Sequence, residues 1–279
     1  MLSYRHSFHA GNFADLLKHI VLVEILQHLT HKDTAFEYID THSGVGLYDL
    51  QSSDSQKLHE YTEGIGKLNF EEFPELSRYF DVIKSFNDSD TIKFYPGSPS
   101  IAQYFLRMQD RGWLFELHPK DYELLQSNFS RCRNIRARYQ DGFKGLMALV
   151  PPKSRRGVVL IDPSYEIKSD YNQVIDAVIK AHKKFAQGIY CIWYPVVDRQ
   201  NIQKMEKKII QSGIKNIQRF ELGVTEDSSQ SGMTSSGMIV INPPWKLFDK
   251  MSQLLPKLSR HLRDNNQPIF KCEVLVGES

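Results

Sequence analysis

Apolar runs and helical patterns follow one another along most of the chain. Seven segments are predicted to be strands, several of them strongly apolar, and lie at 35–39, 113–117, 136–140, 158–161, 188–196, 217–222 and 238–241, with a further candidate at 270–276. Helical spacing is found at 12–29, from 120 onward, and at 143–149, 171–185 and 201–211. Strands that alternate with helices predict an α/β fold with a doubly wound, mostly parallel sheet.

The first predicted helix has a clear start. Asn12 is a suitable N-cap and Asp15 follows three residues later, where an acidic side chain favours a helix N-terminus. The apolar residues that follow repeat at helical intervals. We therefore expect one apolar face, formed by Phe13, Leu16, Leu17, Ile20, Val21 and Ile25.

The spacing between predicted strand ends indicates an insertion. Glu116 and Asp141 are 25 residues apart, and Asp141 and Asp162 are 21 apart, which suits one helix and one strand each. Asp40 and Glu116 are 76 residues apart, which leaves a surplus of roughly 50 residues. We place this surplus in a small helical subdomain at 48–95, with helices at 56–68 and 71–86, inserted into a main domain of 1–47 and 96–279.

The composition is that of a globular protein and limits the candidate partners. The 279 residues carry a net charge of +2, so nucleic-acid binding would require a local basic surface. Two interpretations of the basic residues stay open, contact with RNA phosphates or a solvated charged face; these residues are Arg131, Arg133, Arg136, Arg138, Lys153, Arg155 and Arg156. Three dispersed cysteines predict a reducing cytoplasm, and the apolar runs are too short to span a membrane.

Four acidic residues follow predicted parallel strands: Asp40, Glu116, Asp141 and Asp162. Ligands of such sheets bind outside the carboxyl ends of the strands, and the glycine at Gly44 lets the backbone approach a ligand closely. The sequence around Gly44 has neither the GxGxxG spacing of a dinucleotide site nor the GK(S/T) of a nucleotide-triphosphate loop, which disfavours NAD and ATP. Glu116 is suited to bind ribose hydroxyls and Asp141-Gly142 to face an adenine amine, which predicts S-adenosylmethionine as the ligand.

A motif for chemistry on amines follows the strand at 158–161. Asp162-Pro163-Ser164-Tyr165 resembles the (D/N/S)PP(Y/F) motif of methyltransferases that act on exocyclic amines of nucleobases. A carboxylate and a backbone carbonyl that accept both N–H groups localise the nitrogen lone pair, and an aromatic ring stacks on the base. Asp162, Pro163 and Tyr165 are therefore the candidate catalytic residues.

The whole chain resembles the RlmJ family of bacterial 23S ribosomal RNA adenine N6-methyltransferases, some members of which carry an older label for catabolism of external DNA. The similarity rests on MLSYRHSFHAGNFADLLKH, DTHSGVG, YPGSP, ELHP, DGF, SRRG, IWYPVV and SGMIVINPPW. It implies a Rossmann-like class I methyltransferase that uses S-adenosylmethionine. The implied donor contacts are His19, His42, Ser98, Glu116, Asp141 and Gly142, with Lys18 beside them; Asp162 is the implied catalytic acceptor and Tyr4 the implied RNA contact.

The same resemblance implies 23S ribosomal RNA as the partner, with no membrane and no obligate protein partner, and we expect a cytoplasmic monomer. The chain departs from the family motif at Ser164, where proline is usual. Proline there contributes stiffness and no reacting group, so we expect activity to be retained.

Several alternatives accompany this interpretation. Asn242-Pro243-Pro244-Trp245 also fits the amine motif, and we treat it as a second wall of the base pocket or a strand-end turn. His6, His9, His19 and His42 have no metal-ligand spacing, so we expect no metal. A DNA-utilisation protein, either a nuclease or a DNA-binding protein, is one alternative function. A DNA adenine N6-methyltransferase is another.

Overall fold

The computed structural model describes residues 8–89, 91–228, 232–263 and 267–278. Its main feature is an eight-stranded sheet in the order β10-β8-β9-β7-β6-β1-β4-β5. These strands are β1 (Glu37–Asp40), β4 (Arg111–Glu116), β5 (Ile135–Tyr139), β6 (Gly157–Ile161), β7 (Ile189–Val196), β8 (Ile217–Gly223), β9 (Ser235–Ile241) and β10 (Ile269–Val276). All eight sequence-predicted strands are therefore present, with small shifts of their ends.

The sheet is parallel at its centre and antiparallel at one side. β5, β4, β1, β6 and β7 pair in parallel, whereas β9 runs antiparallel to both β7 and β8. β10 adds an antiparallel edge beside β8. This arrangement confirms a doubly wound, mostly parallel α/β sheet. The carboxyl ends of the five parallel strands lie at one edge of it.

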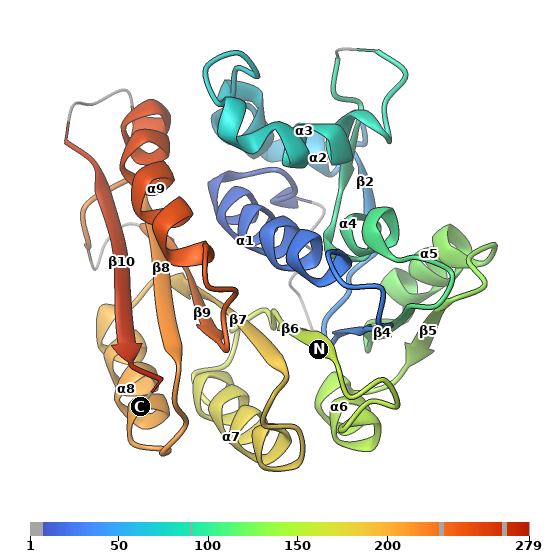
Figure 1. The fold of residues 1–279 in the computed structure, drawn as a ribbon. Helices are drawn as coiled ribbons and strands as arrows, with labels where there is room; N and C mark the ends of the chain where they lie inside the picture. The colour runs from blue at the N-terminus through green and yellow to red at the C-terminus, as the bar shows by residue number, and fades with distance from the viewer. Residues whose placement is uncertain (1–7, 90, 229–231, 264–266, 279) are drawn as a thin grey trace.

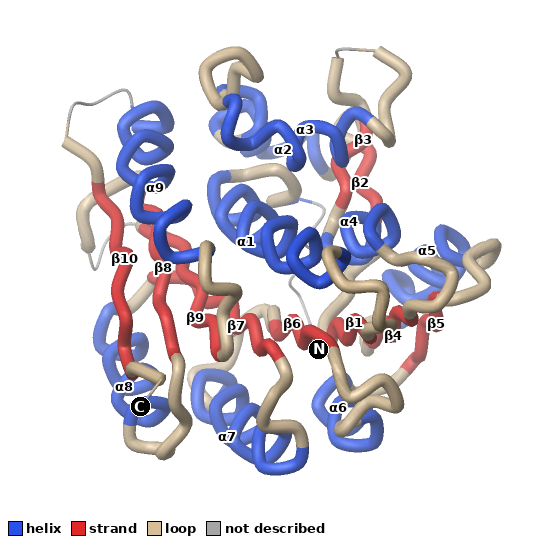
Figure 2. The backbone as a smooth tube through the Cα atoms, viewed as in Figure 1, coloured by secondary structure: helices blue, strands red, loops and turns tan. Residues whose placement is uncertain are grey.

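Two helical layers cover the sheet, as Figures 1 and 2 show. One layer contains α1 (Phe13–Thr30), α4 (Ser98–Phe105), α5 (Pro119–Phe129) and α9 (Leu247–Arg263). The other contains α6 (Gly142–Leu149), α7 (Asp170–Lys184) and α8 (Arg199–Ile210). The core is formed by strand residues that face both layers, and the strands β1, β6 and β7 are buried along their whole lengths.

The helix α1 begins as predicted but is buried on more than one face. The Oδ1 atom of Asn12 accepts hydrogen bonds from the backbone N–H groups of Ala14 and Asp15, at 3.0 and 3.1 Å. The expected apolar face packs inward, and Lys18 and His19 are buried as well. A lysine in such a position requires charge partners, which the site provides.

The segment 48–95 contains less regular helix than the sequence predicts. Its helices are α2 (Ser55–Leu58) and α3 (Ser77–Lys84), joined by short 3₁₀ turns at Glu60–Glu63, Ile65–Lys67 and Pro74–Leu76. The continuous helices expected at 56–68 and 71–86 are therefore wrong. Gly64, Gly66 and Pro74 interrupt them, because glycine and proline disfavour helix interiors.

The two ends of this segment lie side by side. β2 (Leu47–Asp49) pairs antiparallel with β3 (Phe94–Pro96), so that Leu47 is opposite Pro96. The apolar side chains of the segment are continuous with the core around α1, and the N–H group of Ile65 donates to the carbonyl of Gly11 at 2.9 Å. The division into two structural units stays a prediction.

Two helices outside this segment, α4 and α9, were not predicted from the sequence. α4 begins beside Pro99, a residue that the first turn of a helix accommodates. α9 contains Pro256 in its interior, although proline there removes a backbone hydrogen bond. Leu254, Leu255 and Leu258 of α9 are buried, so tertiary packing outweighs this local cost.

Candidate active site

The four acidic residues expected at strand ends lie along one edge of the sheet. Asp40 and Glu116 end β1 and β4, while Asp141 and Asp162 follow β5 and β6. These strands are parallel neighbours, so their carboxyl ends meet. The four acids therefore lie at the same edge of the sheet, as the sequence predicts.

A cavity of about 290 Å³ lies at this edge. Its lining includes ten of the predicted site residues: Lys18, His19, His42, Gly44, Ser98, Glu116, Asp141, Gly142, Asp162 and Pro163. Among its lining residues there is one lysine and no arginine, while six are acidic. That charge pattern suits a cationic nucleoside such as S-adenosylmethionine and disfavours a phosphorylated ligand. We call this cavity the donor pocket.

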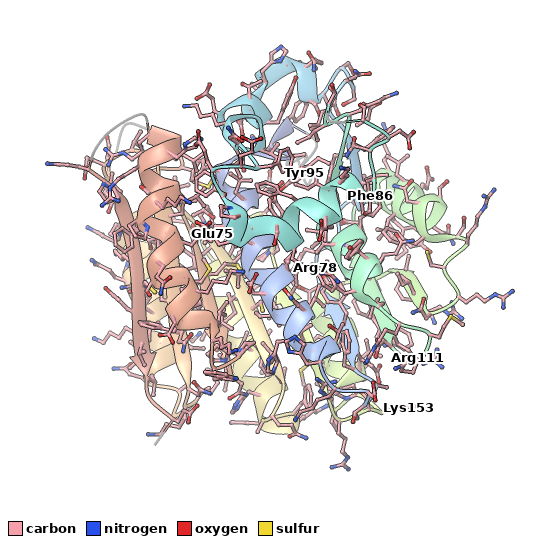
Figure 3. All side chains as sticks on the ribbon, turned by 45° about the horizontal axis from the view of Figure 1, so that its top comes forward. Glu75, Arg78, Phe86, Tyr95, Arg111 and Lys153 are labelled. Carbon is pink, nitrogen blue, oxygen red and sulfur yellow. The ribbon has the colours of Figure 1, made fainter. Side chains whose placement is uncertain are left out.

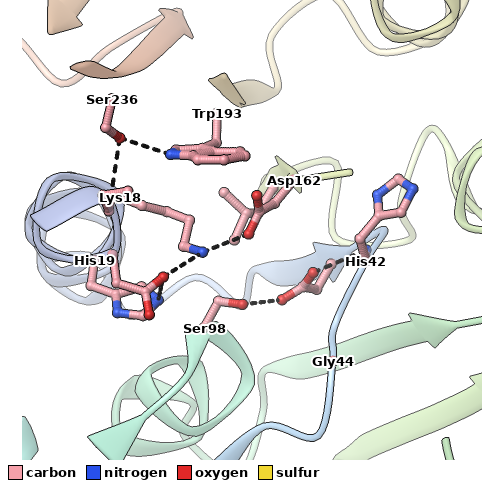
Figure 4. Close-up of polar contacts among 12 residues, drawn as sticks. Lys18, His19, His42, Gly44, Ser98, Asp162, Trp193 and Ser236 are labelled. Atoms are coloured by element: carbon pink, nitrogen blue, oxygen red, sulfur yellow. Dashed lines mark hydrogen bonds and ion pairs between the residues drawn. The ribbon is translucent and has the colours of Figure 1, made fainter. Parts of the chain in front are cut away.

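Lys18 is the charged centre of the site (Figure 4). Its Nζ atom donates to Oδ2 of Asp162 at 2.6 Å and lies 2.8 Å from Oδ1 of Asp15. Nζ also lies 5.6 Å from the centroid of the Trp193 ring. Burial opposes the charge on Lys18, but the two carboxylates outweigh burial and raise its pKa well above the usual value. Lys18 is therefore a cation held between two elements of the site.

Asp40 lies beneath the donor pocket and does not line it. Its Oδ2 atom accepts from the hydroxyls of Tyr38 at 2.6 Å and Ser98 at 2.7 Å, and its Oδ1 atom from the N–H group of His42 at 3.3 Å. Complete burial raises the pKa of Asp40 to about 6, although these hydrogen bonds act in the opposite direction. The carboxyl group thus joins the end of β1 and the turn after it to the first residue of α4.

Glu116 connects two strand-end turns. Its Oε2 atom accepts from the N–H group of Gly44 at 2.8 Å, and Oε1 accepts from that of His118 at 2.7 Å. Burial raises the pKa of this carboxyl group. Gly44 has a φ of 57°, a left-handed conformation that glycine adopts without strain. Each carboxylate oxygen retains a further lone pair, so the carboxyl group can also accept from a ribose.

At the end of the donor pocket near β5, the backbone at Gly142 packs closely against the backbone at Thr41. A Cβ atom at Gly142 would lie 1.9 Å from the carbonyl oxygen of Thr41, so only glycine fits there without movement. Asp141 caps α6 by accepting from the N–H group of Lys144 at 2.9 Å. His42 packs edge-on against Phe143, and burial lowers the pKa of His42 to about 4.

Tyr165 lies in a neighbouring cavity of about 380 Å³, which we call the aromatic pocket. Its ring packs against Tyr171 and Trp193, with centroid distances of 4.5 and 5.9 Å. Its hydroxyl donates to the carbonyl of Trp193 at 2.6 Å, and its φ of 53° is left-handed. The turn that begins at Asp162 therefore directs the carboxylate and the tyrosine toward different cavities.

Asn242-Pro243-Pro244-Trp245 is not part of this site. It follows β9, which runs antiparallel to β7, so Asn242 lies at the opposite edge of the sheet. The Nδ2 atom of Asn242 donates to the carbonyls of Ala186 and Gly188, each at 2.8 Å. The expectation of a second wall of the base pocket is wrong, and the turn interpretation holds. Trp245 is largely exposed.

The structure adds two residues that sequence analysis did not assign to the site. Asp15 accepts from Lys18 and from the N–H group of Gly11. Trp193 lies beside Lys18, and its Nε1 atom donates to the hydroxyl of Ser236 at 2.9 Å. The i, i+3 spacing of Asp15 and Lys18 was a usable sequence signal. Trp193 carried none, because a tryptophan inside an apolar strand resembles any core residue.

The remaining candidates lie outside both pockets or outside the described residues. Tyr4 and His6 fall outside the described residues. The other basic candidates line neither pocket; Arg131, Arg133, Arg136, Arg138, Lys153 and Arg155 are exposed (Lys153 is labelled in Figure 3). Arg156 donates to the carbonyls of Leu29 and Thr34. Within the described ranges, no group of three or more His, Cys, Asp or Glu residues could hold a metal ion. No helix in the described part of the chain is long and apolar enough to cross a bilayer.

A Rossmann-like sheet, acidic strand ends and a donor pocket without basic phosphate ligands define the protein as a class I methyltransferase that uses S-adenosylmethionine. The chain belongs to the family described as ribosomal RNA large subunit methyltransferase D, RlmJ, whose model matches residues 33–274.

Three similar proteins match this chain over at least 94% of its length. It is 51% identical to ribosomal RNA large subunit methyltransferase J of Haemophilus influenzae, with 100% of each chain covered. It is 50% identical to the protein of the same name from Escherichia coli, with 94% of each covered. A crystal structure of a Legionella pneumophila protein matches with a TM-score of 0.87 and 37% identity, covering 95% of this chain and 98% of that one.

Proposed function

We propose that the protein transfers the methyl group of S-adenosylmethionine to N6 of one adenine in 23S ribosomal RNA. The observation that carries this proposal is the position of the turn that begins at Asp162. Ser164 and Glu166 line both the donor pocket and the aromatic pocket, so this turn separates them. A methyl donor in one cavity and a base in the other would face each other across this turn, whose first residue, Asp162, lines the donor pocket.

The aromatic pocket suits a nucleobase. Tyr165, Tyr171 and Trp193 contribute aromatic surface to its lining, and a base stacked on such surface gains about 1–3 kcal/mol. A base in this pocket has left its stacked position in the RNA, as chemistry on an exocyclic amine requires. Its N6 amine would then lie toward Asp162 and the carbonyl of Pro163.

In this proposal Asp162 and the Pro163 carbonyl accept the two N–H groups of the amine, which localises the nitrogen lone pair. S-adenosylmethionine supplies a methyl group bound to cationic sulfur. Asp162 is then assigned as the acceptor of the proton that the methylated nitrogen loses. Lys18 keeps Asp15 as a charge partner when Asp162 turns to the amine, so the lysine remains compensated.

In this proposal the residues that bind S-adenosylmethionine are Lys18, His19, Asp40, His42, Gly44, Ser98, Glu116, Asp141 and Gly142. Asp40 contributes indirectly, by accepting a hydrogen bond from Ser98 in the pocket lining. Asp162, Pro163 and Tyr165 are assigned to catalysis, and Tyr4 to RNA contact. We further propose that the protein acts as a cytoplasmic monomer without an obligate protein partner or a catalytic metal.

The names of the two relatives refer to ribosomal RNA, which supports RNA over DNA as the substrate. The test is to incubate the purified protein and labelled donor with 23S ribosomal RNA or adenine-containing duplex DNA, followed by mass spectrometry of nucleosides. We expect N6-methyladenosine in the RNA, also in the presence of a chelator. Methylation of DNA alone would favour the DNA methyltransferase, and chelator-sensitive cleavage would favour the DNA-utilisation protein.

A further inference from the structure

A chain of three buried polar groups connects the segment 48–95 to the donor pocket. The hydroxyl of Tyr79 on α3 lies 2.9 Å from the hydroxyl of Tyr95 on β3, which lies 2.8 Å from Nδ1 of His19 on α1. All three side chains are almost completely buried, at 1% exposure or less. Figure 3 labels Tyr95 in the N-terminal part of the fold, which is drawn in blue to teal.

The direction of these hydrogen bonds can be deduced from the available acceptors. Among the described residues, the hydroxyl of Tyr79 has Tyr95 as its hydrogen-bond partner, and Tyr95 has Tyr79 and His19. If His19 donated to Tyr95, Tyr95 would donate to Tyr79, and the Tyr79 proton would be buried without an acceptor. That arrangement is unfavourable, because a buried donor without an acceptor loses its hydrogen bond to water and gains none in the protein. In the opposite direction every hydroxyl proton has an acceptor.

We propose that Tyr79 and Tyr95 are positioning residues that fix His19 with its proton on Nε2, so that His19 offers the donor pocket a hydrogen-bond donor. Tyr79 donates to Tyr95, and Tyr95 donates to Nδ1 of His19. The ring nitrogen that accepts sets the tautomer of the other. Nε2 also lies 3.9 Å from the carboxylate of Asp15, where a proton on Nε2 is favoured over a lone pair.

The fixed proton determines which end of the methyl donor His19 recognises, and this step rests on the proposed function. Glu116 and Asp141 form the nucleoside side of the donor pocket, whereas His19 on α1 and Asp162 after β6 form the other side. The amino-acid end of S-adenosylmethionine offers a carboxylate as acceptor and an ammonium group as donor. An N–H group on Nε2 pairs with the carboxylate, while a lone pair would pair with the ammonium group.

The tautomer can be measured directly in the wild-type protein. Histidine labelled with ¹⁵N gives different shifts for protonated and unprotonated ring nitrogens, and a His19→Gln variant assigns the His19 signals. At about pH 8 we expect an unprotonated Nδ1 and a protonated Nε2. Tyr95→Phe should shift the Nδ1 signal, because it removes the hydrogen bond to that atom. A proton on Nδ1 of the wild-type protein would overturn the proposal.

The consequence for binding is tested with two ligands that differ only in the carboxylate, S-adenosylmethionine and decarboxylated S-adenosylmethionine. Calorimetry should show that Tyr95→Phe weakens S-adenosylmethionine about fivefold, the value of one hydrogen bond, and leaves the decarboxylated ligand unchanged. Tyr79→Phe should have a smaller effect of the same kind. In a His19→Ala background, Tyr95→Phe should not change the ratio of the two affinities.

Tyr190→Phe is the matched control, because it also removes one buried tyrosine hydroxyl, which donates to the carbonyl of Phe185 at 2.9 Å. It should leave the ratio of affinities at the wild-type value. Equal weakening of both ligands by Tyr95→Phe, or no weakening of either, would contradict the positioning role. If the wild-type protein bound neither ligand, the proposed function would fail instead, and the tautomer measurement would still decide the hydrogen-bond direction.

Discussion

The buried carboxyl group of Asp40 should make the stability of the protein depend on pH in a specific direction. Burial raises its pKa to about 6 from the ordinary aspartate value of 3.8. A group whose pKa is higher in the folded state stabilises the fold when protonated, and this stabilisation is lost as pH rises through the folded pKa. A difference of about two pKa units corresponds to about 3 kcal/mol. Between about pH 4 and pH 8, most of this free energy should disappear.

The measurement is urea unfolding of the wild-type protein and Asp40→Asn across this pH range. Asparagine keeps an acceptor for Tyr38 and Ser98 but has no charge to bury, and its amide is poorly placed for the N–H group of His42. That mismatch costs a constant amount at every pH, so only the change with pH is informative. We expect the wild-type protein to lose about 2–3 kcal/mol relative to the variant from about pH 4 to pH 8. A difference that stays flat, or that changes in favour of the wild-type protein, would refute the reasoning.

Four further substitutions test the site. Asp162→Asn should reduce turnover at least about 100-fold while donor affinity, measured by calorimetry, changes less than about twofold, because the carboxylate acts on the amine. Glu116→Ala should weaken binding of the demethylated donor by about 1–3 kcal/mol, and unchanged affinity would contradict its assignment to the ribose. Gly142→Ala should lower both the melting temperature and donor affinity, because its Cβ atom would meet the carbonyl of Thr41. Ser164→Pro should keep activity within about twofold, since no hydrogen bond from the Ser164 N–H group is present among the described residues; a large loss would assign Ser164 a direct role.

The residues that could be predicted from sequence are those whose role is set locally. A strand-length apolar run that ends at or before an acid places Asp40, Glu116 and Asp162 at strand ends, because the position and length of a strand follow from a few neighbouring residues. The cap of α1 at Asn12 is local in the same sense. Positions of this kind require no knowledge of what packs against them.

Contacts across long sequence separations could not be predicted in this way. Lys18 and Asp162 are 144 residues apart, and their hydrogen bond exists only because α1 packs across the sheet beside β6 and β7. Tyr79 and Tyr95 become neighbours of His19 through the pairing of β2 with β3 and the packing of α3 on α1. In each case a polar side chain is buried where local pattern predicts apolar residues, and its partner comes from another element.

Two segments resemble the amine-methyltransferase motif, and the direction of the preceding strand decides which of them reaches the donor pocket. Asp162-Pro163-Ser164-Tyr165 and Asn242-Pro243-Pro244-Trp245 both follow strongly apolar strands, and both begin with a residue able to accept from an amine. The strand before the first runs with the parallel centre of the sheet, whereas β9 runs against it. Asn242 therefore lies at the amino ends of the parallel strands, away from the four acidic strand ends. Its side chain donates there to the carbonyls of Ala186 and Gly188. A local motif specifies the shape of a turn, but the direction of the preceding strand determines which edge of the sheet it reaches. The donor pocket lies at the edge of the sheet where the parallel strands end, so strand direction favours Asp162 over Asn242 for the proposed chemistry.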